Sequence, residues 1–265
     1  MSAAESTAVA AASPTVCVEE RGATLVITLN RPAAKNAVNL AMATELADAL
    51  EELDRRDDLT VAVLTGAGGS FCAGMDLKAF LAGERPSLPG RGFAGLVEQP
   101  PAKPIIAAVE GYALAGGFEI ALACDLIVAA DDARFGLPEV RRSLVAAGGG
   151  LLRLPERIPY HLAMEWALTG RMVTAHEAHE ARLISTLTPS GEALTAARSL
   201  ADEIAANGPL AVRATKEIIR SARDWPADEA FDRQRELSEP VRSSEDAREG
   251  ATAFREKRTP TWRGR

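Results

Sequence analysis

The stretch IAAVEGYALAGGFEIALACDLIVAA, residues 106–130, decides the fold class. The apolar run Ile105–Val109 predicts a buried strand, and Leu126–Ala129 predicts a second one. Between them, Gly116-Gly117 opens an apolar segment that reaches about Cys124 and is interpreted as a helix. A strand, a glycine turn, a helix and another strand together indicate an α/β fold.

The residues before this stretch extend the same alternation. Val16–Glu19 and Ala23–Leu29 are rich in β-formers and predict a hairpin. Asn39 is expected to cap a helix that runs to about Arg55, and Val61–Thr65 predicts a short buried strand. Further along the chain, a helix is predicted to start within Met75–Leu81. The next segment, Ala82–Arg91, is predicted to be a flexible flap.

After Ala147 the pattern becomes helical. Before Ala147, a short strand is expected at Ala133–Phe135. After Ala147, only Leu183–Leu187 has the pattern of an extended segment. The sequence therefore predicts an α/β part followed by a helical C-terminal region. The expected helices are Tyr160–Thr169, Ala175–Ala181, Glu192–Ala206, Leu210–Arg223, Ala227–Leu237 and Glu245–Arg255.

Length and composition exclude several classes of protein. A chain of 265 residues is long enough for one substantial core, and a net charge of −7 argues against a nucleic-acid surface. Cys17, Cys72 and Cys124 form no CxxC pair, which argues against a disulfide framework or a zinc site. The chain has no apolar run long enough for a membrane span and no evident targeting signal, so we expect a cytoplasmic protein.

Two glycine-rich turns are candidates for carrying chemistry. They are Cys72-Ala73-Gly74-Met75-Asp76 and Ala115-Gly116-Gly117-Phe118-Glu119, and each leads into a predicted helix. A helix N-terminus exposes unpaired N–H groups, and two such ends that converge make an oxyanion hole. The alternative is that both are ordinary strand-to-helix turns.

Two carboxylates stand in apolar surroundings. Glu119 lies three residues after Gly116, and Glu139 follows Pro138. Burial raises the pKa of a carboxyl group toward neutrality, which suits acid/base catalysis. The alternative is an N-terminal helix position for Glu119 and a surface turn for Glu139, and the residues alone leave both interpretations open.

Other polar groups offer less. His176 and His179 are spaced like a metal pair but lack a third ligand, so a solvated helix face is the better interpretation and no metal site is expected. No GxSxG motif exists, which disfavours a serine hydrolase. The C-terminal segment Ser243–Arg265 is rich in charged residues, and it forms either a solvated helix or a lid that carries Phe254, Lys257 and Arg258.

Taken together, these motifs resemble the enoyl-CoA hydratase/isomerase (crotonase) superfamily. The match keeps the family's order and covers almost everything after the N-terminal tail. Its segments are Leu29–Pro32, Asn36-Ala37, Phe71–Lys78, Ile106–Ala130, Phe135–Glu139, Gly148–Pro155, Leu168–Arg171 and Glu249–Pro260.

The resemblance implies a crotonase-like α/β fold, a spiral of ββα units with a helical C-terminal trimerisation region. We accordingly predict a disordered tail at 1–14, a core with the CoA and acyl site at 15–200, and an oligomerisation and lid region at 201–265. The implied partners are an acyl-CoA thioester and further copies of the chain, as a homotrimer or a dimer of trimers. No cofactor is implied beyond coenzyme A as part of the substrate.

The resemblance also implies an activity and its residues. The activity is the reversible syn addition of water to a 2-enoyl-CoA, with Glu119 and Glu139 as acid and base. The oxyanion-hole amides fall on Met75 and Gly116. The family's substrate- and CoA-binding positions fall on Lys35, Asn36, Ala37, Ala73, Asp76, Leu77, Ala147, Phe254 and Lys257.

Within the family, Gly92–Leu96 and the C-terminal segment resemble the carnitinyl-CoA dehydratase subgroup. Two departures stand out: Ala115 replaces the usual first glycine of a triplet, and Ala146-Ala147 replaces an expected Pro-Asp step. The second departure puts a carnitine-like substrate in doubt. The remaining alternatives are an enoyl-CoA isomerase, another crotonase-family acyl-CoA enzyme, or a scaffold that binds CoA or RNA without catalysis.

Overall fold

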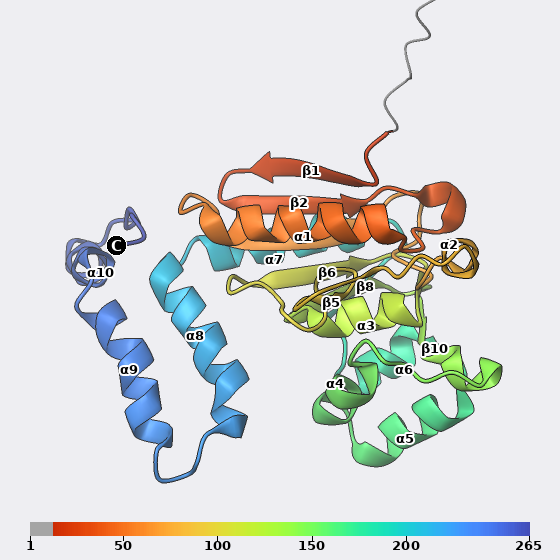
Figure 1. Cartoon of the computed structure of the whole chain (residues 1–265). Helices are drawn as coiled ribbons and strands as arrows, with labels where there is room; N and C mark the ends of the chain where they lie inside the picture. Colours follow the sequence, from red (N-terminus) through yellow and green to blue (C-terminus); the bar gives the residue numbers. More distant parts are fainter. Residues whose placement is uncertain (1–12) are drawn as a thin grey trace, which may run out of the picture.

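A computed structural model describes residues 13–265, so most of the predicted tail lies outside the described residues. Its centre is a six-stranded sheet in which the first two strands are antiparallel and the others parallel (Figure 1). The α/β prediction is confirmed. In sheet order, the strands are β1 (Val16–Arg21), β2 (Thr24–Leu29), β3 (Val61–Gly66), β6 (Ile105–Val109), β8 (Leu126–Ala130) and β11 (Thr186–Thr188).

The two faces of the sheet carry different helices because successive side chains point to opposite sides. Val61 and Val63 of β3 pack against the small residues of α7 (Ala193–Ala205). Ala62 and Leu64 of the same strand point into the main core, which also contains the buried face of helix α1. The sheet therefore has an apolar layer on each face: a small one against α7 and the main core on the face that packs against α1.

Helix α1 (Leu40–Arg55) confirms the predicted cap, because the Asn39 side chain accepts a hydrogen bond from Met42 N–H at 3.1 Å. The remaining helices of the α/β part are α2 (Leu77–Leu81), α3 (Gly116–Ala123), α4 (Gly150–Arg157), α5 (Tyr160–Thr169) and α6 (Ala175–Glu180). The short 3-10 turns in the same part are η1 (Pro32–Ala34) and η2 (Pro138–Arg142).

Three short features differ from the sequence prediction. The predicted flap contains the strand β4 (Ser87–Leu88), which forms a small hairpin with β5 (Gly92–Phe93). The strand β7 (Tyr112–Leu114) was not predicted, and neither was α4. With β9 (Arg134–Gly136) and β10 (Val173–Thr174), β7 forms a second sheet beside α3.

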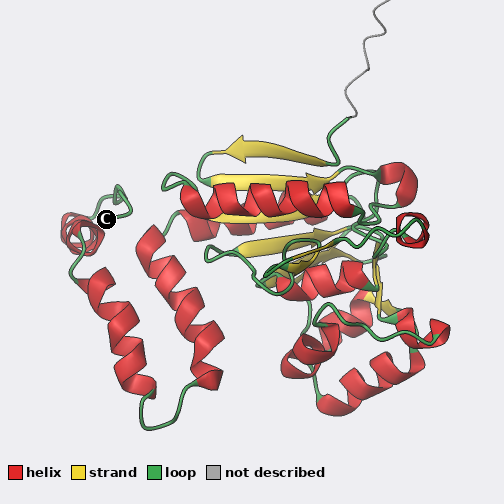
Figure 2. Cartoon of the chain, in the orientation of Figure 1, coloured by secondary structure: helices red, strands yellow, loops and turns green. Residues whose placement is uncertain are grey.

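The last helices form an arm that extends from the sheet region (Figures 1 and 2). They are α8 (Pro209–Ser221), α9 (Ala230–Arg242) and α10 (Glu245–Glu256), with the turn η3 (Ala222–Asp224) between the first two. The predicted division at residue 200 falls inside α7, whereas the chain leaves the sheet at α8. None of the described helices is long and apolar enough to cross a membrane.

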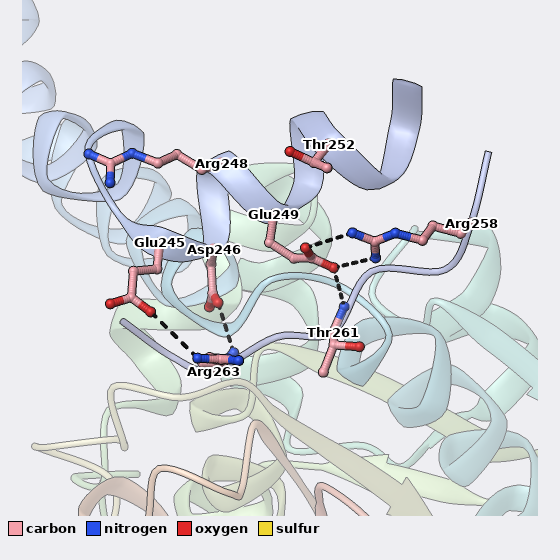
Figure 3. A pocket seen from close by; sticks show the side chains of 8 residues that line it. All are labelled: Glu245, Asp246, Arg248, Glu249, Thr252, Arg258, Thr261 and Arg263. Carbon is pink, nitrogen blue, oxygen red and sulfur yellow. Dashed lines mark hydrogen bonds and ion pairs between the residues drawn. The ribbon is translucent and has the colours of Figure 1, made fainter. Parts of the chain in front are cut away.

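The C-terminal residues fold back onto α10 (Figure 3). Buried Asp246 accepts hydrogen bonds from the N–H groups of Arg263 and Gly264 at 2.7 and 2.8 Å. The Trp262 indole N–H donates to Ala206 O at the end of α7 at 2.8 Å, which ties the far end of the arm to its base. A groove of about 570 Å³ lies here, lined by Glu249 and other mostly paired charged groups of α10 and the C-terminal residues.

Candidate active site

The two glycine turns that the sequence singled out meet in space. A Cβ atom placed on Gly74 would lie 3.2 Å from the backbone N of Gly116 and 3.0 Å from the Ala115 Cβ. Gly74 has φ +98°, a left-handed conformation that other residues rarely adopt. The close approach and this backbone conformation together explain why glycine stands at position 74.

The Met75 amide is left free by the bonds on either side of it. Val38 N–H donates to Gly74 O at 2.8 Å, and Asp76 N–H donates to Val38 O at 2.9 Å. Met75 N–H has no acceptor within residues 13–265. Gly116 is the first residue of α3, where the N–H group has no partner inside the helix. Two free amides therefore lie on adjoining turns, the arrangement that an oxyanion hole requires.

Close packing around the second turn depends on its glycines. A Cβ on Gly116 would come 2.5 Å from Cε1 of Phe93, and one on Gly117 would come 2.1 Å from Cys72 O. Phe93 belongs to β5, so the small hairpin covers this turn. Ala115 precedes it with φ 51° and ψ −128°, an unusual conformation for a residue with a side chain.

Glu119 lies in the first turn of α3 but is not a simple helix-end residue. Its side chain is 4% exposed, and Oε1 accepts a hydrogen bond from Gly150 N–H at 3.0 Å. Burial raises its pKa above the ordinary value, and hydrogen bonds from the Gly150 and Gly148 amides, followed by the charge of Arg153, act in the opposite direction. The carboxylate is therefore buried but well solvated by protein groups.

Glu139 has a different environment. It lies in η2, and its buried Oε2 atom has no hydrogen-bond partner among the described residues. Burial raises its pKa and the negative charge of Glu119 raises it further, whereas its own backbone N–H and, to a lesser degree, the charge of Arg142 lower it. A half-buried carboxyl coupled to a second carboxyl is not the simple surface turn that the sequence left open. Paired carboxyl groups of this kind suit acid/base chemistry.

The predicted CoA-binding loop lies beside the Met75 turn. Lys35 O accepts a hydrogen bond from Ala73 N–H at 3.0 Å, and the Lys35 ammonium lies 4.8 Å from the centre of the Tyr112 ring. Asn36 is buried, and its side chain donates to Ala67 O and Ser70 O. Its side-chain amide is thus committed to holding the loop, and its backbone N–H donates to Arg31 O at 2.9 Å, so neither group is available to a ligand.

Three more predicted positions, Ala37, Asp76 and Leu77, lie next to Asn36 or Met75 along the chain. Ala37 lies between Asn36 and the buried Val38, whose N–H donates to the Met75 turn. Asp76 caps α2 and forms an ion pair with Arg31 at 2.8 Å, so its carboxylate is occupied. Leu77 is the first residue of α2 and is 51% exposed.

The remaining predicted positions lie in other parts of the chain. Ala147 is exposed and directly precedes the glycines that surround Glu119. Phe254 is 87% exposed on α10, and Lys257 ends that helix in a left-handed conformation. Figure 1 places α10 on the opposite side of the chain from α2, so a single chain does not bring these two residues to the Met75 turn.

The structure adds residues that sequence reasoning missed. A Cβ on Gly148 would lie 2.6 Å from Oε2 of Glu119, so this glycine and Gly150 form the wall around the carboxylate. Phe93 lies against Gly116, and Arg153 lies near Glu119. The run Gly148-Gly149-Gly150 was the only available signal, because adjacent glycines often mark a close approach. Among residues 13–265, no group of three or more His, Cys, Asp or Glu side chains is placed to hold a metal ion.

The sequence profile of the enoyl-CoA hydratase/isomerase family matches residues 19–265. The chain belongs to this family. The enoyl-CoA hydratase EchA19 of Mycobacterium tuberculosis is 46% identical over 95% of this chain and 97% of its own length. A carnitinyl-CoA dehydratase of Proteus mirabilis is 43% identical over 92% of this chain and 97% of its own length.

Solved structures of the enoyl-CoA hydratase/isomerase family agree with the fold. An enoyl-CoA hydratase from Mycobacterium tuberculosis H37Rv superposes with a TM-score of 0.94 at 60% identity, covering 96% of this chain and 100% of that one. A carnitinyl-CoA hydratase from Mycobacterium avium gives 0.76 at 43% identity, with the same coverage. The predicted membership of the crotonase superfamily and the crotonase-like fold are thereby confirmed, as is the enzyme class of the chain as a hydro-lyase.

Proposed function

We propose that this enzyme adds water reversibly, in the syn sense, across the double bond of a 2-enoyl-CoA thioester. The observation that carries the proposal is the pairing of two carboxyl groups, buried Glu119 and half-buried Glu139, with the free amides of Met75 and Gly116. Each part answers one need of the reaction. The amides bind the oxygen on which negative charge develops, and the carboxyl groups move the protons.

Burial raises the pKa of both carboxyl groups, but the polar and charged groups next to them differ. Glu119 accepts an N–H hydrogen bond and faces the charge of Arg153, and both contacts favour its ionised form. Glu139 has a buried oxygen without a partner and a negative neighbour, and both favour its protonated form. We therefore assign Glu119 as the base toward water and Glu139 as the proton donor, with the pair titrating as one coupled unit.

The bonds and protons then balance. Glu119 takes a proton from water as the water oxygen forms a bond to Cβ. The electron pair of the double bond moves toward the thioester oxygen, where the N–H groups of Met75 and Gly116 stabilise the enolate. Glu139 gives its proton to Cα, and exchange with solvent restores the two protonation states. The reaction uses no group beyond the CoA thioester itself.

Two coupled carboxyl groups favour hydration over double-bond isomerisation, which needs a single base. We propose an acyl chain without a cationic head group, because Arg141 and Arg142 follow Glu139 in η2 and the step Ala146-Ala147 carries no carboxylate. A trimethylammonium group would be repelled there. We therefore expect a lower kcat/KM for carnitinyl-CoA than for simple enoyl-CoA thioesters.

We also propose a homotrimer or a dimer of trimers, located in the cytoplasm. Large apolar side chains are exposed along the arm: Ile219 at 69%, Phe231 at 73% and Phe254 at 87%. Contact with a second copy would cover them. In such an assembly, Phe254 and Lys257 of one subunit would approach the CoA bound by a neighbour, and sedimentation equilibrium tests the assembly directly.

The test of the activity is the loss of enoyl-thioester absorbance with crotonyl-CoA, with crotonobetainyl-CoA in parallel. Glu119→Gln and Glu139→Gln should each lower kcat by about 10²–10⁴-fold, the usual contribution of an acid or base. Glu180→Gln, on the exposed side of α6, is the matched control and should keep wild-type activity. Full activity in Glu139→Gln would refute the mechanism that uses both glutamates.

A further inference from the structure

Arg153 is a half-buried cation beside the glycine turn Gly148–Gly150, which surrounds Glu119. It lies on α4, one turn after Gly149, and its Nη2 donates a hydrogen bond to Val97 O at 2.5 Å. A Cβ atom placed on Gly149 would lie 2.3 Å from Nη1 of Arg153, so the guanidinium group packs directly against the backbone of this glycine turn. One side chain thus contacts two segments that lie more than fifty residues apart in the sequence.

Both segments lead to the reacting groups. Val97 follows Phe93, whose ring lies against Gly116, and Gly149 stands between the two glycines that surround Glu119. Gly150 N–H donates to the Glu119 carboxylate. A displaced Arg153 would therefore disturb the cover over the second glycine turn and the wall around Glu119.

The charge of Arg153 is not neutralised by a close partner. It forms no ion pair within the described part of the chain, and the carboxylates whose charge reaches it are Glu156 and Glu119. Burial, followed by the charge of Arg220 on α8, lowers its pKa. The charge of Arg153 from α4 acts on Glu119, and the charge of Glu119 acts on Glu139 from η2. The charge of Arg220 from α8 acts on Arg153.

We propose that Arg153 is a positioning residue of the hydration site, which fastens the Phe93–Val97 segment to the Gly148–Gly150 turn and brings its positive charge to the wall around the Glu119 carboxylate. The inference rests on the proposed function for its kinetic consequence but not for its effect on the Glu119 carboxylate. A half-buried guanidinium without an ion pair is costly to keep. Here its position is explained by the two backbone segments and the carboxylate that it serves.

The test compares Arg153→Gln with Arg157→Gln. Arg157 is the matched control, because it lies one turn further along α4, is also half-buried and donates to one backbone carbonyl, Cys124 O at 2.8 Å, but does not act on Glu119. Arg153→Gln should lower kcat/KM by about 10–100-fold through misplacement of the site. It should also move the acidic limb of the pH profile to higher pH, whereas Arg157→Gln should not.

A direct titration separates this inference from the proposed function. In protein labelled with ¹³C at the glutamate carboxyl carbons, the Glu119 resonance is identified by its loss in Glu119→Gln. Its midpoint should rise in Arg153→Gln and stay unchanged in Arg157→Gln. An unchanged midpoint in Arg153→Gln overturns the inference. A wild-type protein that hydrates no enoyl-CoA overturns the proposed function and leaves this titration valid.

Arg153→Lys covers the case in which the glutamine variant does not fold. Lysine keeps the charge but lacks the two-nitrogen fork that reaches both backbone segments. Arg153→Lys should therefore keep the acidic limb in place while kcat falls. An acidic limb that moves in Arg153→Lys, or wild-type kcat in this variant, contradicts the two roles assigned to the side chain.

Discussion

Glu119 and Glu139 lie in surroundings that suit acid/base chemistry but lower the stability of the folded protein. Both carboxyl groups are kept in surroundings that raise their pKa, mainly through burial. A fold optimised only for stability would place amides or apolar groups here. The cost is compensated only in part: Glu119 accepts a backbone hydrogen bond, whereas Oε2 of Glu139 has no partner in the described residues.

Glu139→Gln should therefore be more stable than the wild type at neutral and alkaline pH. A carboxyl group whose pKa is raised on folding favours the folded state only while it is protonated. Its contribution is complete below the unfolded pKa, about 4.3, and is lost as the pH rises through the folded pKa. Thermal unfolding at about pH 4 and about pH 8 tests this sign. A difference between variant and wild type that is larger at acidic pH would contradict it.

Ala115 stores strain at the start of α3. Its backbone, with φ 51° and ψ −128°, is one that glycine adopts freely. Ala115→Gly should therefore raise the free energy of unfolding by about 1 kcal/mol, after the extra entropy of glycine in the unfolded chain is allowed for. Urea unfolding measures it, and kcat should stay within about twofold because the Gly116 amide is unmoved. A less stable variant would show that Ala115 is not strained.

At the level of elements, the Met75 turn is held by Asp76, the residue that caps α2. Asp76 accepts hydrogen bonds from the N–H groups of Lys78 and Ala79, and it pairs with Arg31 of the loop before η1. These contacts hold the pKa of Asp76 below its usual range, chiefly through the Arg31 hydrogen bond. The helix cap and the ion pair therefore fix the residue next to the free Met75 amide.

Asp76→Ala should lower the free energy of unfolding by about 1–2 kcal/mol, the cost of losing a helix cap. It should also lower kcat, because the Met75 amide is no longer held in place. Asp76→Asn is the informative control: asparagine caps helices as well as aspartate does but pairs less strongly with Arg31. Equal loss of kcat in both variants assigns the effect to the Arg31 pair. Wild-type kcat in Asp76→Ala would refute any role in positioning.

The elements that could be predicted are those with local signals. Helix α1 begins at the Asn39 cap, and α3 begins at Gly116 as expected. Helix α4 escaped prediction because a left-handed glycine precedes it and Pro155 lies inside it. Helix α9 begins at Ala230, later than predicted, and continues through Pro240. Proline removes one internal hydrogen bond from a helix, and α9 ends two residues after Pro240.

The site itself could be predicted only in part. The glycine turns and the two glutamates are visible as residue types in apolar segments, so they could be selected from the sequence. Their partners could not, because the contacts join distant positions: Glu119 with Gly150 and Phe93 with Gly116. No periodicity or local motif encodes such pairs. They arise when the hairpin β4–β5 and the turn before α4 fold over the same end of α3.

At the scale of the whole molecule, the arm is closed on itself by its own C-terminal residues. Figure 3 shows Asp246 and Glu249 of α10 holding the segment that contains Thr261 and Arg263. Trp262 then reaches the end of α7. The orientation of α10, and with it the exposed Phe254, thus depends on a clasp near the end of the chain.

Asp246→Ala should open this clasp. Two hydrogen bonds from backbone N–H groups to a buried carboxylate are lost, so local stability should fall by about 2 kcal/mol. Hydrogen exchange should then accelerate in α10 and the C-terminal residues and stay unchanged in the central sheet. Glu245→Ala is the matched control, because its side chain is 55% exposed and its pairs are worth little. Equal exchange in both variants would show that Asp246 does not hold the arm.

The measurement that tests the central claim most directly is analysis of the product formed from crotonyl-CoA in isotopically labelled water. Syn hydration by the two glutamates yields a 3-hydroxyacyl-CoA that carries one solvent oxygen at Cβ and one solvent hydrogen at Cα on the same face. We expect the wild type to form this product and Glu139→Gln to lose it. A product with a shifted double bond and no solvent oxygen would contradict hydration and identify an isomerase instead.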